Sequence, residues 1–293
     1  MRRLRFGSRD SQLSVRQSQL IIEAVTRAHP EVEAELVTMK TTGDKILDRT
    51  LEEIGGKGLF VRELDQALLD RRVDFTIHSL KDLPVEIPPE LPLVAFSRRE
   101  DPRDALVLPA GQRELDLSKP IGCASRRRQL QLQALFPQAR IAPVRGNVQT
   151  RLSKLDAGQY SALVLAAAGL KRLGLADRIA RYFTTEEILP AAGQGIIAVQ
   201  GRADADCSDV LAASDPDAAA CARAERAFVR WLDGGCTSPV AAYAQVESGR
   251  LTLTGLYVNE DETVVRRGSL SGAAKDAEAL GTALARKLKE GCV

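Results

Sequence analysis

Short apolar runs and amphipathic stretches alternate along the first third of the chain. Residues 4–6 predict a strand, and the segment 11–28 predicts a helix, because its apolar residues, among them Leu20 and Val25, recur on one helical face. Ser8, Asp10 and Ser11 are all suited to cap the start of this helix. This order of elements predicts a mostly parallel sheet covered by helices. Further strands are predicted near 36–39, 73–77 and 93–95, and a further helix over 59–69.

A second unit with the same alternation follows the polar segment 99–102. The segment 129–133 alternates polar and apolar residues like a strand, but Ser125 as an N-cap and the continuation to Phe136 favour a helix. A strand at 196–200 is in a position to return to the first unit. The other strands are predicted at 105–108, 121–123, 141–144 and 162–166, and the other helices after Asn147 and Ala168.

The pattern changes after Asp217. Residues 218–232 predict a strong helix, because Cys221, Ala224 and Phe228 recur at helical spacing. Strands joined by short turns pair antiparallel. The remaining sequence therefore predicts a small α+β unit with a three-stranded antiparallel sheet. Its strands are expected at 240–244, 251–258 and 264–270, followed by a helix over 275–289.

Length and composition are those of a globular protein of two or three domains. The 293 residues are 44% hydrophobic and 27% charged, which is the usual balance. The longest apolar stretch, 161–170, is too short to span a bilayer, and no apolar run follows the basic residues at the start, so we expect a cytoplasmic protein without a membrane partner. The five cysteines are scattered without CxxC or CxH spacing, which predicts neither disulfides nor a metal site.

The net charge is only +2, from 41 basic and 39 acidic residues, but the local distribution of the basic residues is informative about a ligand. Arginines gather where predicted strands end or predicted helices begin. Sheets of this kind place ligands at the carboxyl ends of their strands, and the planar fork of arginine binds carboxylate or phosphate at two points. One arginine alone is more typical of a solvated surface, but the clustering favours an anionic ligand. The basic residues concerned are Arg9, Arg126, Arg127, Arg128, Arg145, Arg151, Lys171 and Arg172.

Six short segments follow one another in a specific order across almost the whole chain. They are GSRDS at 7–11, GGKGLF at 55–60, HSLKDLP at 78–84, REDPRD at 99–104, RGNVQTRL at 145–152 and GGC at 234–236. AGLKRLG at 168–174 and PAAGQG at 190–195 add two more. In this order and at these separations, the chain resembles the porphobilinogen deaminase family.

The resemblance implies an α/β fold of three domains. Two doubly wound domains would resemble those of periplasmic binding proteins, and a small α+β C-terminal domain would contain the three-stranded antiparallel sheet. The implied boundaries are 1–98 with 195–213 for the first domain, 99–194 for the second and 214–293 for the third. The chain would act as a monomer.

The implied activity is that of a transferase in tetrapyrrole (haem) biosynthesis. Four porphobilinogen molecules would be condensed in turn, with loss of ammonia, onto a covalently bound dipyrromethane cofactor. Water would then release linear hydroxymethylbilane. Because porphobilinogen carries acetate and propionate groups, the growing chain needs fixed counter-charge in the cleft.

The resemblance also assigns roles to individual residues. Cys236 would hold the cofactor by a thioether bond, since a thiol can attack an activated pyrrole methylene, and Asp82 would be the catalytic carboxylate. Taken alone, Asp82 is more typical of a turn and Cys236 of a small buried hydrophobe. Asp44, Lys57 and Phe60 would belong to a lid. The residues implied to bind cofactor and substrate are Arg9, Ser11, Lys81, Ser125, Arg127, Arg128, Arg145, Arg151, Arg172 and Gln194.

The chain departs from the family pattern at two positions. Arg126 stands where the family often has an apolar residue, and we expect it to face solvent or the domain surface, so that its replacement by leucine would be nearly silent. Cys123 stands where a small hydroxyl residue is common, and it places a second thiol near the cleft that could complicate labelling. His78 is expected to be structural, because the nearby carboxylate already fills the acid–base role.

Two other classes of protein fit parts of the pattern. A two-lobed anion-binding module without catalysis would account for the first two units, but not for a third unit that carries Cys236. Nucleic-acid binding through residues 126–128 is disfavoured, because only 4% of residues are aromatic and no recognition motif accompanies the basic patch. No nucleic-acid partner is therefore expected.

Overall fold

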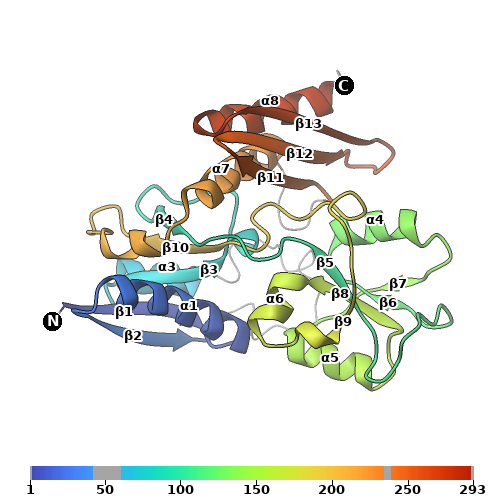
Figure 1. The fold of residues 1–293 in the computed structure, drawn as a ribbon, viewed down its shortest axis with the longest axis horizontal. Helices are drawn as coiled ribbons and strands as arrows, with labels where there is room; N and C mark the ends of the chain where they lie inside the picture. The colour runs from blue at the N-terminus through green and yellow to red at the C-terminus, as the bar shows by residue number, and fades with distance from the viewer. Residues whose placement is uncertain (1, 42–60, 234–238, 292–293) are drawn as a thin grey trace.

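The computed structural model describes residues 2–41, 61–233 and 239–291. Its elements form three sheets, each with its own helices (Figure 1). Two five-stranded α/β sheets occupy the lower left and lower right of Figure 1, and a three-stranded antiparallel sheet lies above them. This arrangement is the predicted fold class. Within the described ranges, no helix is long and apolar enough to cross a membrane.

The first sheet is covered by a helix on each face. Its strands are β1 (Arg2–Arg9), β2 (Val32–Met39), β3 (Phe75–Ser79), β4 (Leu93–Phe96) and β10 (Ile197–Gly201), in the order β2-β1-β3-β10-β4. Helix α1 (Gln12–Ala28) packs on one face through Ile21 and Val25. Helix α3 (Arg62–Leu69) packs on the other through Leu68. The 3-10 helices η1 (Leu80–Asp82) and η3 (Asp209–Ala213) complete this unit.

The second sheet also lies between helices. Its strands are β5 (Asp104–Val107), β6 (Ile121–Gly122), β7 (Ile141–Ala142), β8 (Ala162–Ala166) and β9 (Ile179–Tyr182), in the order β7-β6-β8-β5-β9. Its helices are α4 (Arg126–Leu135), α5 (Val148–Asp156), α6 (Ala167–Arg172) and the 3-10 helix η2 (Ala176–Arg178). Along β8, Ala162 and Val164 pack with α4, whereas Leu163 and Leu165 pack with α5 and α6. The strand is apolar throughout because both of its faces are buried.

Two features of these sheets are not marked by local sequence patterns. The sequence predicts no strand at β9, whose central residues Ala180 and Arg181 are exposed at the sheet edge. In each sheet one strand also runs against both neighbours, β10 in the first and β5 in the second, while the remaining pairs are parallel. The sheets are therefore mixed. Both reversed strands adjoin a segment that crosses between the sheets, so their direction follows from the path of the chain.

The third sheet has the antiparallel order β11-β12-β13 that the sequence predicts. Helices α7 and α8 pack on one face, and Gly281 of α8 lies so close to the Ala224 carbonyl of α7 that a side chain there would collide. The other face packs against Leu189. The elements are α7 (Pro216–Trp231), β11 (Ala241–Glu247), β12 (Arg250–Val258), β13 (Val265–Ala273), the 3-10 helix η4 (Ala274–Asp276) and α8 (Ala277–Glu290).

Two crossover segments, 97–103 and 183–196, connect the first sheet with the second. They contact each other where the Glu100 N–H donates to the Gly195 carbonyl at 3.0 Å. Gly195 has a φ of +89°, and a side chain on it would collide with the Glu100 carbonyl, so the contact requires glycine.

Glu225 of α7 joins the third sheet to both crossovers. Its carboxylate is fully buried and accepts Arg99 Nη2 (2.6 Å) from the first crossover and the Gly193 N–H (2.6 Å) from the second. It also accepts the N–H of Ala244 in β11 at 2.7 Å. One side chain thereby fixes the third sheet to the segments on which the other two sheets meet.

Candidate active site

Asp82 and Arg9 lie at the same edge of the first sheet. Arg9 is the last residue of β1, and Asp82 ends η1, which directly follows β3. Because β1 and β3 are parallel neighbours, their carboxyl ends meet. Both side chains line one small open pocket together with Ser14 and Ser79. Asp82 is exposed, so a ligand in this pocket can reach its carboxylate.

Two polar residues of this part of the molecule, Ser11 and the pocket-lining His78, have structural partners. Ser11 is the N-cap of α1, and its Oγ accepts the Ser14 N–H at 3.2 Å and donates to Ser14 Oγ at 2.8 Å. His78 is buried with Nε2 2.9 Å from Thr76 Oγ1, and burial lowers the pKa of its imidazole from 6.5 to about 4. His78 is therefore uncharged at neutral pH, which agrees with the structural role expected for it.

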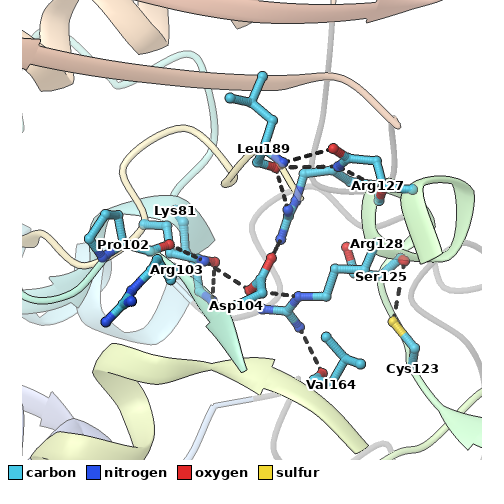
Figure 2. Close-up of polar contacts among 12 residues, drawn as sticks. Lys81, Pro102, Arg103, Asp104, Cys123, Ser125, Arg127, Arg128, Val164 and Leu189 are labelled. Carbon is cyan, nitrogen blue, oxygen red and sulfur yellow. Dashed lines mark hydrogen bonds and ion pairs between the residues drawn. The ribbon is translucent and has the colours of Figure 1, made fainter. Parts of the chain in front are cut away.

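A buried carboxylate, Asp104, binds both Arg127 and Arg128 (Figure 2). Arg127 Nη2 donates to Oδ2 at 2.8 Å, and Arg128 donates to Oδ1 through Nε (2.9 Å) and Nη2 (2.7 Å). Backbone carbonyls accept the next donors, Leu189 from Arg127 Nη1 (2.6 Å) and Val164 from Arg128 Nη1 (3.3 Å). Burial disfavours the charge on Asp104, but the two guanidiniums hold the pKa of its carboxyl well below the usual range.

This group of three residues, the Asp104 cluster, changes the interpretation of the two arginines. The sequence predicts open guanidinium forks for binding carboxylates, whereas the structure ties both to a carboxylate of β5. The cluster nevertheless keeps one net positive charge, because two guanidiniums face one carboxylate. Among the described residues, the buried Arg127 Nε has no hydrogen-bond partner. Asp104 lies in the segment 99–104 that carries the resemblance, but no local pattern reveals its partners.

Gln194 and Lys81 extend the Asp104 cluster toward Asp82. Gln194 is buried, and its Nε2 donates to Asp104 Oδ1 (2.9 Å) and to the Pro102 carbonyl (2.7 Å). Its Oε1 accepts Lys81 Nζ at 3.3 Å. Burial lowers the pKa of the Lys81 ammonium to about 8, although the neighbouring Asp82 opposes this shift. Lys81 therefore links the pocket of the first sheet to the arginines of the second.

Arg151 and Arg172 are partly buried cations that form no ion pair with any residue of the described ranges. Arg151 Nε donates to the Gly146 carbonyl at 2.7 Å, and Arg172 Nη2 donates to the Gly195 carbonyl at 2.6 Å. Burial lowers the pKa of both guanidiniums, that of Arg172 to about 10. A positive charge that lacks a carboxylate partner in a partly buried position is suited to an anionic ligand.

The electrostatic neighbours of Arg151 show which predicted residues come together. After burial, the charges of Arg128 and Arg145 lower the pKa of Arg151 further, and the charge of Asp82 raises it. Together with the hydrogen bonds from Lys81 to Gln194 and from Gln194 to Asp104, this places the carboxylate at the edge of the first sheet and arginines of the second in one region.

The residues at the start of α4 differ in their surroundings. Ser125 is the N-cap, and its side chain forms no cap hydrogen bond. The side chain of Arg126 is 48% exposed, as expected, but it forms an ion pair with Glu262 of the third unit. Cys123 is fully buried, and burial raises the pKa of its thiol. Both properties disfavour reaction of this thiol with labelling reagents.

Four predicted residues, Cys236, Asp44, Lys57 and Phe60, lie outside the described residues. By its position in the chain, Cys236 belongs to the connection between α7 and β11.

Two solved structures of binding proteins align with much of the chain. The effector-binding domain of BenM with benzoate aligns with a TM-score of 0.41 and 16% identity, over 72% of this chain and 88% of that one. An arginine-specific periplasmic binding protein of Salmonella typhimurium aligns with a TM-score of 0.40 and 15% identity, over 75% and 94%.

Two family models match the chain. Residues 4–209 match porphobilinogen deaminase, dipyromethane cofactor binding domain, and residues 219–290 match porphobilinogen deaminase, C-terminal domain. The porphobilinogen deaminase of Acetivibrio thermocellus is 53% identical over 289 residues, 99% of each chain. That of Chromobacterium violaceum is 49% identical over 98% of this chain and 94% of the relative. The chain belongs to the porphobilinogen deaminase family.

Proposed function

We propose that Asp82 and Cys236 are the central residues of the porphobilinogen deaminase reaction that this chain carries out. That activity belongs to tetrapyrrole biosynthesis, releases ammonia and uses a dipyrromethane cofactor. In the proposed course, four porphobilinogen molecules are condensed in turn onto dipyrromethane held by Cys236, and water releases linear hydroxymethylbilane. The observation that carries the proposal is the chain of contacts from Lys81, next to Asp82, through Gln194 at 3.3 Å to the Asp104 cluster of the second sheet.

The residues present fit a ligand rich in carboxylates. Arg151 and Arg172 have no ion-pair partner among the described residues, and the Asp104 cluster carries one net positive charge. A buried cation without a partner costs free energy, which the acetate and propionate groups of pyrroles would offset. These arginines, together with Lys81, would hold the cofactor and the substrate side chains.

Dipyrromethane, when bound, supplies the free pyrrole position that is extended. Asp82 acts on the incoming porphobilinogen, where its carboxylate accepts a hydrogen bond from the pyrrole N–H. In this position it stabilises the positive charge that develops as the amine leaves, and it can relay a proton to the amine nitrogen. Because one carboxylate serves four condensations, the growing chain has to move past Asp82 after each one.

The other predicted binding residues divide by what they contact. Arg9 lines the pocket of Asp82, and Arg145 lies near Arg151, so both are proposed to bind carboxylates directly. Ser125, whose hydroxyl forms no hydrogen bond with any of the described residues, is proposed as a polar contact. Ser11 and Gln194 are proposed to act through what they hold in place, namely α1 and the Asp104 cluster. Asp44, Lys57 and Phe60 remain proposed as a lid.

The proposal is tested by intact mass and turnover of two variants. Cys236→Ser is expected to lack the mass of dipyrromethane and nearly all activity. Asp82→Asn is expected to keep the adduct when it is supplied with preformed cofactor. Its kcat is expected to fall about a thousandfold, the effect of removing a key electrostatic group. The adduct is also detected by the colour reaction of pyrroles with an acidic aldehyde reagent.

Cys221→Ser is the matched control. Cys221 is buried, and burial raises the pKa of its thiol to about 11, which makes it a poor nucleophile. We expect Cys221→Ser to keep the adduct. An adduct that persists in Cys236→Ser and is absent from Cys221→Ser would show that the cofactor is attached elsewhere, and wild-type turnover of Asp82→Asn would remove Asp82 from the mechanism.

We also propose that each sheet is the centre of one domain, with boundaries at 1–98 with 195–213, 99–194 and 214–293. The described cysteines Cys123, Cys207 and Cys221 are free thiols, which is typical of a reducing compartment and supports a cytoplasmic location. A monomer is proposed as the working unit, because both sides of the candidate site come from one chain.

A further inference from the structure

Helix α4 begins with three consecutive arginines and has no acidic residue in its first turn. The positive end of the helix dipole lies at this terminus, so the three guanidiniums are unfavourable there unless they are offset. The carboxylate of Asp104, from the second sheet, balances the charges of Arg127 and Arg128. The charge of the remaining arginine, Arg126, is balanced by Glu262 of the third unit.

Arg126 and Glu262 form a two-point ion pair between these two parts of the molecule. Arg126 Nε donates to Oε1 at 2.6 Å, and Nη2 donates to Oε2 at 2.5 Å. Glu262 lies in the turn between β12 and β13 with a φ of +55°. Asn259 stabilises this turn, because its Oδ1 accepts the Val264 N–H at 2.8 Å. The carboxylate therefore comes from a turn that has hydrogen bonds of its own.

The ion pair borders an apolar contact between the same two parts. Leu256 of β12 packs with Leu189 of the second crossover, and Leu130 of α4 packs against this cluster. Arg267 of β13 adds a second polar contact by donating Nη2 to the Thr185 carbonyl at 2.9 Å. Figure 1 shows the β12–β13 hairpin extending toward α4. An apolar centre fixes the separation of the two parts, and directional contacts at its edges fix their relative rotation.

We propose that Arg126 is a positioning residue which, through Glu262, sets the third sheet in register with the arginines of α4. Strand β11 begins at Ala241, five residues after Cys236, and Ala241 belongs to the apolar contact. A shift of the third sheet along α4 would displace the start of β11, the strand that follows Cys236 in the chain, relative to the Asp104 cluster. The inference rests on the proposed role of Cys236.

The structure therefore changes what is expected of Arg126→Leu. From the sequence this substitution would be nearly silent, because the residue faces the surface. Exposed ion pairs generally contribute little, but those with two-point geometry are the exception. Leucine would keep the packing of the side-chain stem and lose both hydrogen bonds to Glu262.

The test compares Arg126→Leu, Glu262→Gln, their double variant and the charge exchange Arg126→Glu with Glu262→Arg. We expect the KM for porphobilinogen to rise about two- to fivefold in each single variant, the range of a well-oriented exposed pair, with little change in kcat or in the melting temperature. The double variant should be no worse than either single variant, and the exchange should restore most of the loss.

Arg178→Leu is the matched control. Arg178 forms a two-point pair with Asp156 at 2.7 and 3.2 Å, but both residues belong to the second unit. Its loss should leave the KM unchanged. Three results would each overturn the proposal. The first is a KM of the double variant that reflects the sum of the two single losses. The others are a charge-exchange variant that melts like wild type but keeps the raised KM, and a rise in KM for Arg178→Leu as large as that for Arg126→Leu. Intact mass reports the cofactor separately, so absence of dipyrromethane from the wild-type protein would refute the proposed function instead.

Discussion

At the scale of single residues, burial decides how His78 responds to pH. The residue is 7% exposed, and burial lowers the pKa of its imidazole from 6.5 to about 4 because it disfavours the charged form. Between these pH values the unfolded chain binds a proton that the folded chain does not. Stability that is present above pH 6.5 is therefore lost as the pH falls toward 4, by about 3 kcal/mol in total.

His78→Gln is expected to remove this part of the acid dependence. The difference in free energy of unfolding between wild type and variant should narrow as the pH is lowered from 6.5 to 4, when it is measured by urea denaturation at each pH. His29→Gln replaces the only other histidine, which is partly exposed, and serves as the control. If the free energy of unfolding of His78→Gln fell with pH as steeply as that of wild type, other groups would cause the acid sensitivity.

At the scale of elements, the position of helix α4 depends on a carboxylate from strand β5. Asp104 of β5 holds Arg127 and Arg128 of α4, and each of these three side chains is at least nine-tenths buried. Removing one partner of a buried ion pair leaves the other charge uncompensated, which costs more than the pair contributes. The anchoring of α4 is therefore more sensitive to Asp104 than to either arginine alone.

Asp104→Asn is expected to lower the free energy of unfolding by about 3–5 kcal/mol, because it leaves two buried guanidiniums without a carboxylate. Urea denaturation followed by circular dichroism measures this loss. Asp177→Asn, at an exposed position of η2, is the control and should change stability little. If the two variants were equally stable, the Asp104 cluster would not be what anchors α4.

At the scale of the whole molecule, Glu225 holds the third sheet on the two crossovers. Its three hydrogen bonds, to Arg99, Gly193 and Ala244, reach elements that are far apart in the sequence. Trp231 is the only tryptophan and lies at the end of α7, where it packs against the core of the third sheet. Its fluorescence therefore reports on the third sheet separately from the other two.

Glu225→Ala is expected to destabilise the attachment of the third sheet by about 3–5 kcal/mol, because Arg99 loses its buried partner. The Trp231 fluorescence transition in urea should move to lower concentrations than the transition seen by circular dichroism. Glu247→Ala, at an exposed position of β11, should leave both transitions unchanged. Coincident transitions in Glu225→Ala would contradict the role of Glu225 as the connection between the sheets.

The sequence by itself determined the elements whose signals are local. The α1 helix was predictable because its apolar face and its candidate caps lie within one segment, and the structure selects Ser11 among Ser8, Asp10 and Ser11. The same holds for α4, where a cap and a continuous run outweighed the strand-like alternation of 129–133. The third sheet was predictable because its strands are joined by short turns. The motifs that identify the family are also read without a structure, since they depend on residue types and on their order.

Only the tertiary structure decided which side chains meet. Asp104 and Arg128 belong to different elements, as do Arg126 and Glu262, which lie 136 residues apart. The direction of β5 and β10 depends on crossovers between the sheets, and β9 shows no apolar alternation because it is an exposed edge strand. A local pattern indicates whether a residue is buried and whether a helix can begin there. It does not indicate which residue a side chain pairs with, because a charge on one segment is balanced by whichever segment the packing of the whole chain brings next to it.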